Sequence, residues 1–137
     1  MQMAQKAQAD KDFKFAAKQW QLIWKNDPDS TYAPLARLQA GICNIQTQDY
    51  QQAIDNLKTA IPQLTDQEVQ VPKAKLFLGF SQYELGKRLQ ASSDEAQLKQ
   101  STELLATATQ TFEQLLTSSP KFTDAVQACY FQGGAYE

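Results

Sequence analysis

Residues able to do catalytic or metal chemistry are scarce in this sequence. The 137 residues include no histidine and two cysteines, Cys43 and Cys129. A zinc site needs about four ligands from cysteine, histidine or carboxylate side chains, so we predict no metal site. We interpret both cysteines as small buried apolar side chains and expect no disulfide between them.

The remaining candidates for acid-base chemistry are carboxylates at isolated positions. Glu103 and Glu113 could be imagined as a catalytic pair, but no motif around them would match their pKa values to a reaction. We interpret both as part of a solvated helix face. Gly133 and Gly134 form too short a glycine run to cradle a phosphate. The sequence therefore predicts neither an enzyme nor a cofactor site.

Composition narrows the class of protein further. The chain carries 13 basic and 15 acidic residues, with a formal net charge of −2 and no block of one sign, so we expect no nucleic-acid partner. No apolar run approaches the roughly 20 residues that cross a bilayer, and we expect no membrane insertion. Only five glycines and five prolines interrupt a sequence rich in helix formers, which favours an all-α fold.

A repeat becomes visible when the sequence is aligned with itself. Five residues recur 92 positions later without a gap: Pro28, Thr31, Ala33, Ala36 and Gly41 return as Pro120, Thr123, Ala125, Ala128 and Gly133. A third copy, 38 positions after the first, keeps the alanine and glycine as Ala74 and Gly79. The segments before the two prolines match as well: Ala16, Trp20 and Ile23 return as Ala53, Leu57 and Ala60, and as Ala108, Phe112 and Leu115. These residues stand three and four apart, so each set lies on one face of a helix.

The glycines of this pattern need a physical reason, because glycine inside a helix costs about 1 kcal/mol against alanine. We expect the neighbouring helix to place a bulky side chain directly over Gly41 and over Gly79. Gly41 stands 12 residues before Ala53. Ala4 precedes Ala16 by the same interval, so the repeat extends to the start of the sequence.

These residues resemble the tetratricopeptide repeat (TPR), which has a small residue in its first helix, an alanine and an aromatic residue in its second, and a proline at its end. The resemblance covers nearly the whole chain. It implies a right-handed α-α superhelix, a TPR-like solenoid of about three helical hairpins plus an unpaired terminal helix. The longer linker at 28–33 is similar to repeats of bacterial cell-envelope proteins, such as the Tol-Pal coordinator and the outer-membrane assembly lipoproteins, which implies the periplasm or cell envelope rather than the cytoplasm.

We predict one domain, 1–137, with repeats at about 1–28, 33–64 and 70–120 and a partial repeat at 123–137. The expected helices cover 1–9, 13–26, 33–47, 50–62, 70–90, 95–118 and 123–137. Capping-box spacing at Asp49/Gln52 and at Ser92/Glu95 supports two of these helix starts.

The third repeat is longer than the other repeats. Gly79 and Ala108 stand 29 residues apart, where the other repeats have 12. We therefore expect a longer hairpin that turns at 91–94, and the alternative is a flexible insertion. The terminal helix at 123–137 has no partner, so we expect the chain to be a fragment of a longer array. Alternatively, a second subunit covers that helix, which predicts a homodimer through residues 123–137.

The resemblance implies that the first helices line a concave face that binds a peptide or helix of another protein. The inward positions of this sequence form an apolar strip: Leu38, Ile42, Ile45, Leu76, Phe80, Tyr83 and Tyr130. Exposed apolar and aromatic patches are typical of interaction sites. The same spacing also occurs where helices pack together, so core packing remains an alternative. We expect a protein-protein interaction scaffold, and the alternative function is a structural or self-associating spacer within a larger assembly.

Overall fold

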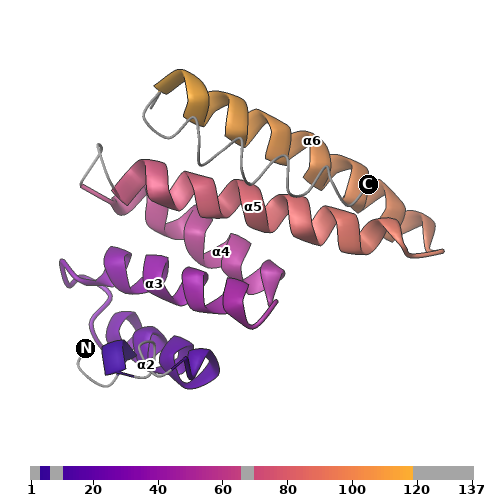
Figure 1. Cartoon of the computed structure of the whole chain (residues 1–137). Coiled ribbons are helices and arrows are strands. Elements are labelled where there is room, and N and C mark those ends of the chain that lie inside the picture. The colour runs from indigo at the N-terminus through magenta and orange to yellow at the C-terminus, as the bar shows by residue number, and fades with distance from the viewer. Residues whose placement is uncertain (1–3, 7–10, 66–69, 119–137) are drawn as a thin grey trace. The chain divides into compact units, whose positions relative to one another are not determined.

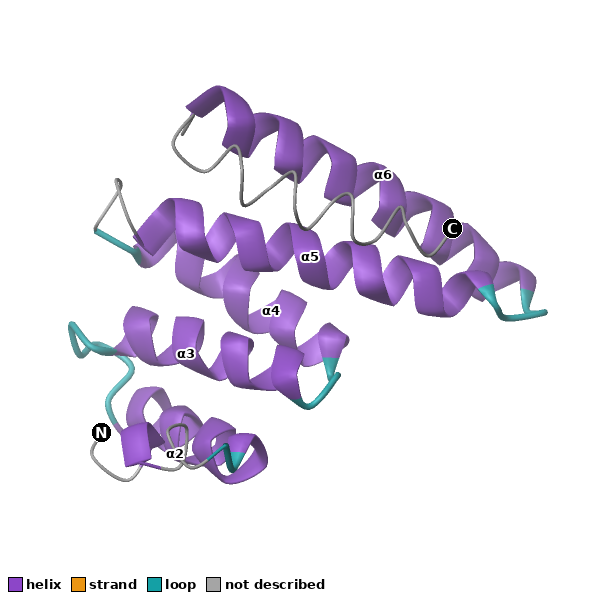
Figure 2. Cartoon of the chain, in the orientation of Figure 1, coloured by secondary structure: helices purple, strands orange, loops and turns teal. Residues whose placement is uncertain are grey.

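The computed structural model describes residues 4–6, 11–65 and 70–118, and these residues form helices joined by short turns, without a strand (Figures 1 and 2). The elements are α2 (Phe13–Asn26), α3 (Ala33–Gln46), α4 (Tyr50–Ala60), the short 3-10 helix η1 (Ile61–Gln63), α5 (Gln70–Gln90) and α6 (Glu95–Ser118). The chain divides into two compact units, Met1–Asp66 and Gln67–Glu137. The first unit contains α2, α3 and α4, and the second contains α5 and α6.

The predicted all-α class is confirmed, and most helix limits agree with the sequence prediction. The helices expected at 13–26, 70–90 and 95–118 have those limits, and α3 and α4 each end within two residues of the expected position. Residues 4–6 are helical within the expected opening helix 1–9. The predicted terminal helix at 123–137 lies outside the described residues.

In the first unit, α2 and α3 pack through small side chains on α3 and bulky ones on α2. Their common core consists of the buried residues Ala4, Ala16, Trp20, Trp24, Ala33, Ala36, Ala40 and Cys43. The alanines of α3 lie three and four residues apart, so they make one smooth face against which the indole rings fit. Ala4 belongs to this core, as its position in the repeat requires.

The hairpin of α3 and α4 is closed by the contact that the glycine pattern predicts. A Cβ atom built on Gly41 would lie 2.9 Å from Leu57 Cγ, so the leucine covers bare backbone. Residues 47–49 then connect the helices, with Gln48 at a φ of 62°. The Asp49 amide donates to the Asn44 carbonyl at 2.8 Å, which satisfies one of the last carbonyls of α3.

The same turn occurs before α2. Lys11 has a φ of 63°, and it is followed by Asp12, as Gln48 is followed by Asp49. Both aspartates are N-caps with φ −90° and ψ 72°, and each accepts a hydrogen bond from an amide three residues on at 3.4 Å. The two turns are 37 residues apart, the interval between Ala16 and Ala53. The sequence repeat of the first unit is therefore also a repeat of backbone conformation.

In the second unit, α5 and α6 lie antiparallel along their length (Figure 1). Cβ atoms built on Gly79 and Gly86 would lie 2.8 Å from the Phe112 ring and 2.9 Å from Leu105 Cγ. The Ser101 hydroxyl donates to the Gly86 carbonyl at 2.6 Å. This second contact lies seven residues beyond the first on α5, so the expected longer hairpin is a continuous pair of helices rather than a flexible insertion.

The start of α6 corrects one detail of the sequence prediction. The cap is Asp94 rather than Ser92, because Asp94 Oδ1 accepts from the Ala96 amide at 2.9 Å. Ser92 acts one step earlier, since its hydroxyl accepts from the Asp94 amide at 3.1 Å. Both residue types cap helices well, and here they act in succession to form the turn at 91–94.

Candidate functional site

The predicted apolar strip falls on α3 and α5, with unequal burial. On α3, Leu38 is completely buried, whereas Ile42 and Ile45 are half-buried. On α5, Tyr83 is buried and has Lys87 Nζ 5.3 Å from its ring centroid. Leu76 and Phe80 are half-buried, and Tyr130 lies outside the described residues. Leu38 and Tyr83 therefore act as packing residues here, and the remaining described positions keep some exposed surface.

Helix α3 presents three faces within its unit. Ala36, Ala40 and Cys43 belong to the core shared with α2, and Gly41 contacts Leu57 of α4. Leu35 lies on the remaining face and is 37% exposed. Ile42 lies on the same face, seven residues further along the helix. This third face keeps apolar surface that the described part of the first unit leaves accessible.

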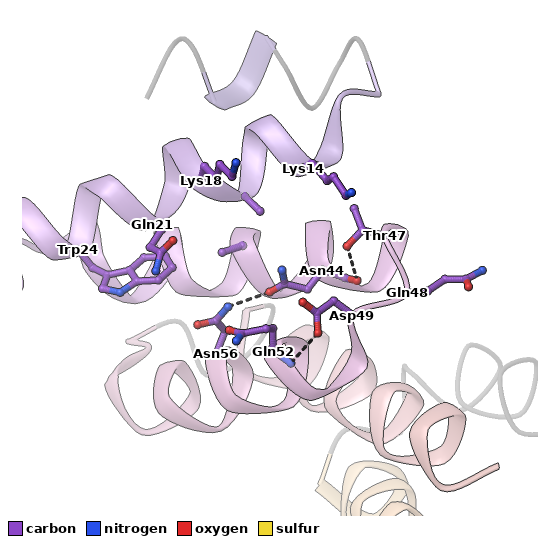
Figure 3. A pocket seen from close by; sticks show the side chains of 12 residues that line it. Lys14, Lys18, Gln21, Trp24, Asn44, Thr47, Gln48, Asp49, Gln52 and Asn56 are labelled. Atoms are coloured by element: carbon purple, nitrogen blue, oxygen red, sulfur yellow. Dashed lines mark hydrogen bonds between the residues drawn. The ribbon is translucent and has the colours of Figure 1, made fainter. Parts of the chain in front are cut away.

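A second candidate is an open groove of about 680 Å³ that lies entirely within the first unit (Figure 3). Its walls come from α2 and α4 and its floor from α3. The lining residues are Lys14, Ala17, Lys18, Gln21, Trp24, Ala40, Asn44, Thr47, Gln48, Asp49, Gln52 and Asn56. None of the residues predicted from the apolar strip is among them, so the groove is a site that the sequence prediction missed.

Two asparagines form the centre of this groove. Asn56 Nδ2 donates to Asn44 Oδ1 at 2.8 Å, joining α4 to α3 (Figure 3). Among the described residues, no further partner binds the Asn44 amino group or the Asn56 carbonyl oxygen. The pair therefore offers an amino group that can donate and a carbonyl oxygen that can accept, which together suit the C=O and N–H of a peptide unit.

Charge is distributed unevenly around the groove. Lys14 and Lys18 stand four residues apart on α2 and are exposed, and no carboxylate of the described residues forms an ion pair with them. Asp49 is the single acidic side chain of the lining, and its carboxylate caps α4 by accepting from the Gln52 amide. The α2 wall is therefore cationic, while the rest of the lining is mostly neutral and amide-rich.

The groove and the apolar strip occupy opposite sides of α3. A helix turns about 100° per residue, so Asn44 and Thr47 project within about 40° of Ala40. Ile42 projects about 200° from Ala40, and Leu35 lies close to the direction of Ile42. A molecule in the groove and a molecule on the strip would therefore contact different surfaces.

Two further observations concern groups in the described part of the chain that could bind a metal ion or act as a nucleophile. No group of three or more histidine, cysteine, aspartate or glutamate side chains is placed there to hold a metal ion. Cys43 is buried, and burial raises the pKa of its thiol from 9.0 to about 11, which keeps it protonated and unreactive at neutral pH.

Comparison with family models, with curated proteins and with solved structures finds no significant match for this chain. None of the helices within the described ranges is both long and apolar enough to span a membrane.

Proposed function

We propose that this chain is a TPR-like helical-repeat scaffold that binds a peptide or helix of another protein on the apolar face of α3, the first helix of its second repeat. The observation that carries the proposal is a repeated contact. Leu57 covers Gly41 and Phe112 covers Gly79, at matching positions of the aligned sequence copies. A solenoid of stacked hairpins requires this repetition, because each hairpin must bury its apolar face in the same way.

A polar contact follows the same register. Asn44 stands three residues after Gly41 and bonds Asn56, the residue before Leu57. In the second unit, the equivalent residues are Gln82 and Thr111, whose side-chain oxygens lie 2.9 Å apart. The two hairpins therefore share an apolar and a polar contact at equivalent positions, which supports the interpretation that they are copies of one structural repeat.

The proposed binding face lies on α3. Its two other sides are occupied by α2 and α4, whereas Leu35 and the nearby Tyr32 are 37% and 53% exposed. Half-buried Ile42 continues this surface by one heptad. Aromatic and aliphatic side chains of this kind supply most of the binding energy at protein interfaces.

The experiment that tests this proposal is selection from a phage-displayed library of 16-residue peptides on the full chain. We expect selected peptides to bind the parent and to lose binding to Ile42→Glu, because a charge would then face their apolar residues. Gln63→Glu, an exposed change in η1, adds the same charge elsewhere and should not alter binding. Helicity and melting temperature are measured for all three proteins.

Two results would count against the proposal. If the selected peptides bind the Ile42→Glu variant and the parent with equal affinity, the apolar strip is not part of the binding surface. A parent chain whose mass in sedimentation equilibrium rises with concentration, together with failure to select any peptide, would favour a self-associating spacer.

A further inference from the structure

We propose that the groove between α2, α3 and α4 binds an extended segment of another protein that carries two carboxylates two residues apart. The inference rests on the proposed role as a protein-binding scaffold. It assigns that role a second surface and a chemically defined partner, since the groove lies on the side of α3 opposite the apolar strip.

The length of the groove suits a short extended segment. Its lining follows α2 from Lys14 to Trp24 (Figure 3), and the ten residue steps between them advance about 15 Å along the helix axis. An extended chain advances about 3.3 Å per residue, so about four or five residues fit along this wall.

The spacing of the two lysines selects the spacing of the carboxylates. Lys14 and Lys18 are four residues apart on α2, about 6 Å along its axis. In an extended chain, residues i and i+2 project from the same side about 6.6 Å apart. A partner segment with two acidic residues separated by one other residue would therefore place one carboxylate opposite each ammonium group.

The amides of the groove suit the main chain of such a segment. The free amino group of Asn44 can donate to a peptide carbonyl, and the free oxygen of Asn56 can accept from a peptide N–H. Gln21 and Gln52 add further amides on the two walls. Amides bind main-chain groups of any sequence, so the lysines supply the selectivity and the amides hold the extended conformation.

The composition of the lining disfavours other occupants. An amphipathic helix would require an apolar stripe, but Trp24, Ala17 and Ala40 are the apolar residues of the lining. A nucleic acid would require more positive charge than two lysines beside one aspartate supply.

The binding test uses blocked, fluorescein-labelled octapeptides that differ only in charge spacing. The first contains Asp-Thr-Asp at its centre, the second separates the same two aspartates by three threonines, and the third contains Lys-Thr-Lys. Fluorescence anisotropy against the full chain should give the tightest binding for Asp-Thr-Asp, with affinity falling as salt rises.

Substitutions place the binding in the groove. Lys14→Gln and Lys18→Gln should each weaken Asp-Thr-Asp binding about two- to fivefold, whereas Lys58→Gln, an exposed lysine of α4 outside the groove, should leave it unchanged. Asn44→Asp retains the acceptor for Asn56 and adds a negative charge, so it should weaken binding about tenfold or more. Gln46→Glu adds the same charge on the opposite side of α3 and serves as its control.

The proposal fails if none of the octapeptides binds at millimolar concentration, or if binding ignores aspartate spacing and the Asn44→Asp substitution. Preference for Lys-Thr-Lys would also overturn it. A parent dimer that Asn44→Asp dissociates would mean that a second copy fills the groove instead. Any of these results leaves the strip proposal standing, because Lys14, Lys18 and Asn44 all lie away from the strip.

Discussion

The first hairpin, α3 and α4, and the second hairpin, α5 and α6, use one contact at two different lengths. A bulky side chain covers a glycine in each, with Leu57 over Gly41 and Phe112 over Gly79. The first hairpin turns at 47–49, soon after this contact, whereas the second continues to a further glycine contact at Gly86 before it turns at 91–94. The glycine contact therefore fixes how two helices pair, while turn residues fix where the pair ends.

The polar contact of the two hairpins has the same position but a different environment. Gln82 is 2% exposed and faces Thr111 inside the second unit, whereas the Asn44–Asn56 pair is half-buried and borders the open groove. A buried polar group depends on its single partner, but a half-buried one can turn to water or to a ligand. The same polar contact is therefore enclosed by packing in one hairpin and borders an open groove in the other.

The largest expected effect tests the shared glycine contact. Phe112→Ala should lower the free energy of unfolding by about 3–5 kcal/mol, because it leaves a cavity over Gly79. Leu57→Ala should cost about 2–5 kcal/mol for the same reason in the first hairpin. Urea denaturation followed by circular dichroism measures both, with Leu98→Ala as the partly exposed control that should cost less.

A double substitution sharpens this test. Gly79→Ala alone should destabilise the parent, because its methyl group would lie 2.8 Å from the Phe112 ring. In the Phe112→Ala background the clash is gone, and the same change should stabilise the chain by up to about 1 kcal/mol through helix propensity. If Gly79→Ala has the same sign in both backgrounds, Phe112 does not require glycine at this position.

Effects of intermediate size are expected from substitutions in the two polar contacts, Gln82–Thr111 and Asn44–Asn56. Thr111→Val should cost about 1–3 kcal/mol, because buried Gln82 loses the hydroxyl that faces it. Asn56→Ala should cost less, since half-buried Asn44 can bond water instead. The free energy of unfolding in urea measures both changes.

The matched control for Thr111→Val is Thr109→Val. Thr109 is exposed on the same helix, and its hydroxyl, like that of Thr111, lies within hydrogen-bond distance of a carbonyl four residues earlier. Its replacement keeps the β-branched shape but removes no buried contact. Equal costs for the two valine substitutions would contradict a specific role for Gln82.

The helices could be predicted from sequence because their signals are local. The limits of α6 follow from the polar turn before it and from the apolar spacing that runs through Ala108, Phe112 and Leu115, and the close glycine contacts follow from the repeat alone. The cap at Asp94 could not be chosen over Ser92, since both side chains can cap and only the three-dimensional turn decides between them.

The groove could not be predicted because its residues are ordinary in isolation. Asn44 and Asn56 are polar residues on separate helices, and their pairing depends on the register that Gly41 and Leu57 impose. Apolar spacing likewise predicts which side of α3 Leu38 occupies, but not how far neighbouring elements cover it. Aligning the polar residues of the hairpins, as Asn44 aligns with Gln82, is the sequence signal that would have found the pair.

The smallest expected effect on the free energy of unfolding at neutral pH comes from the residue that stands two positions after the covered glycine of each hairpin. Cys43 occupies it in the first hairpin and Ser81 in the second, and both are completely buried. Burial raises the pKa of the Cys43 thiol from 9.0 to about 11. The unfolded chain therefore releases this proton more readily, so the stabilising contribution of the neutral thiol is complete below pH 9 and is lost between pH 9 and 11.

Comparing two proteins isolates this contribution. The parent carries Cys129→Ser, and the variant carries Cys43→Ser in addition. Serine is the residue that occupies the equivalent position in the second hairpin. Serine does not ionise, and all other titrating groups are common to both proteins, so they cancel in the difference. We expect the parent to lose free energy of unfolding relative to Cys43→Ser as pH rises from 9 to 11, measured in urea. A difference that stays constant over this range, or thiol labelling of the folded parent with a midpoint near pH 9, would mean that the core around Cys43 admits water.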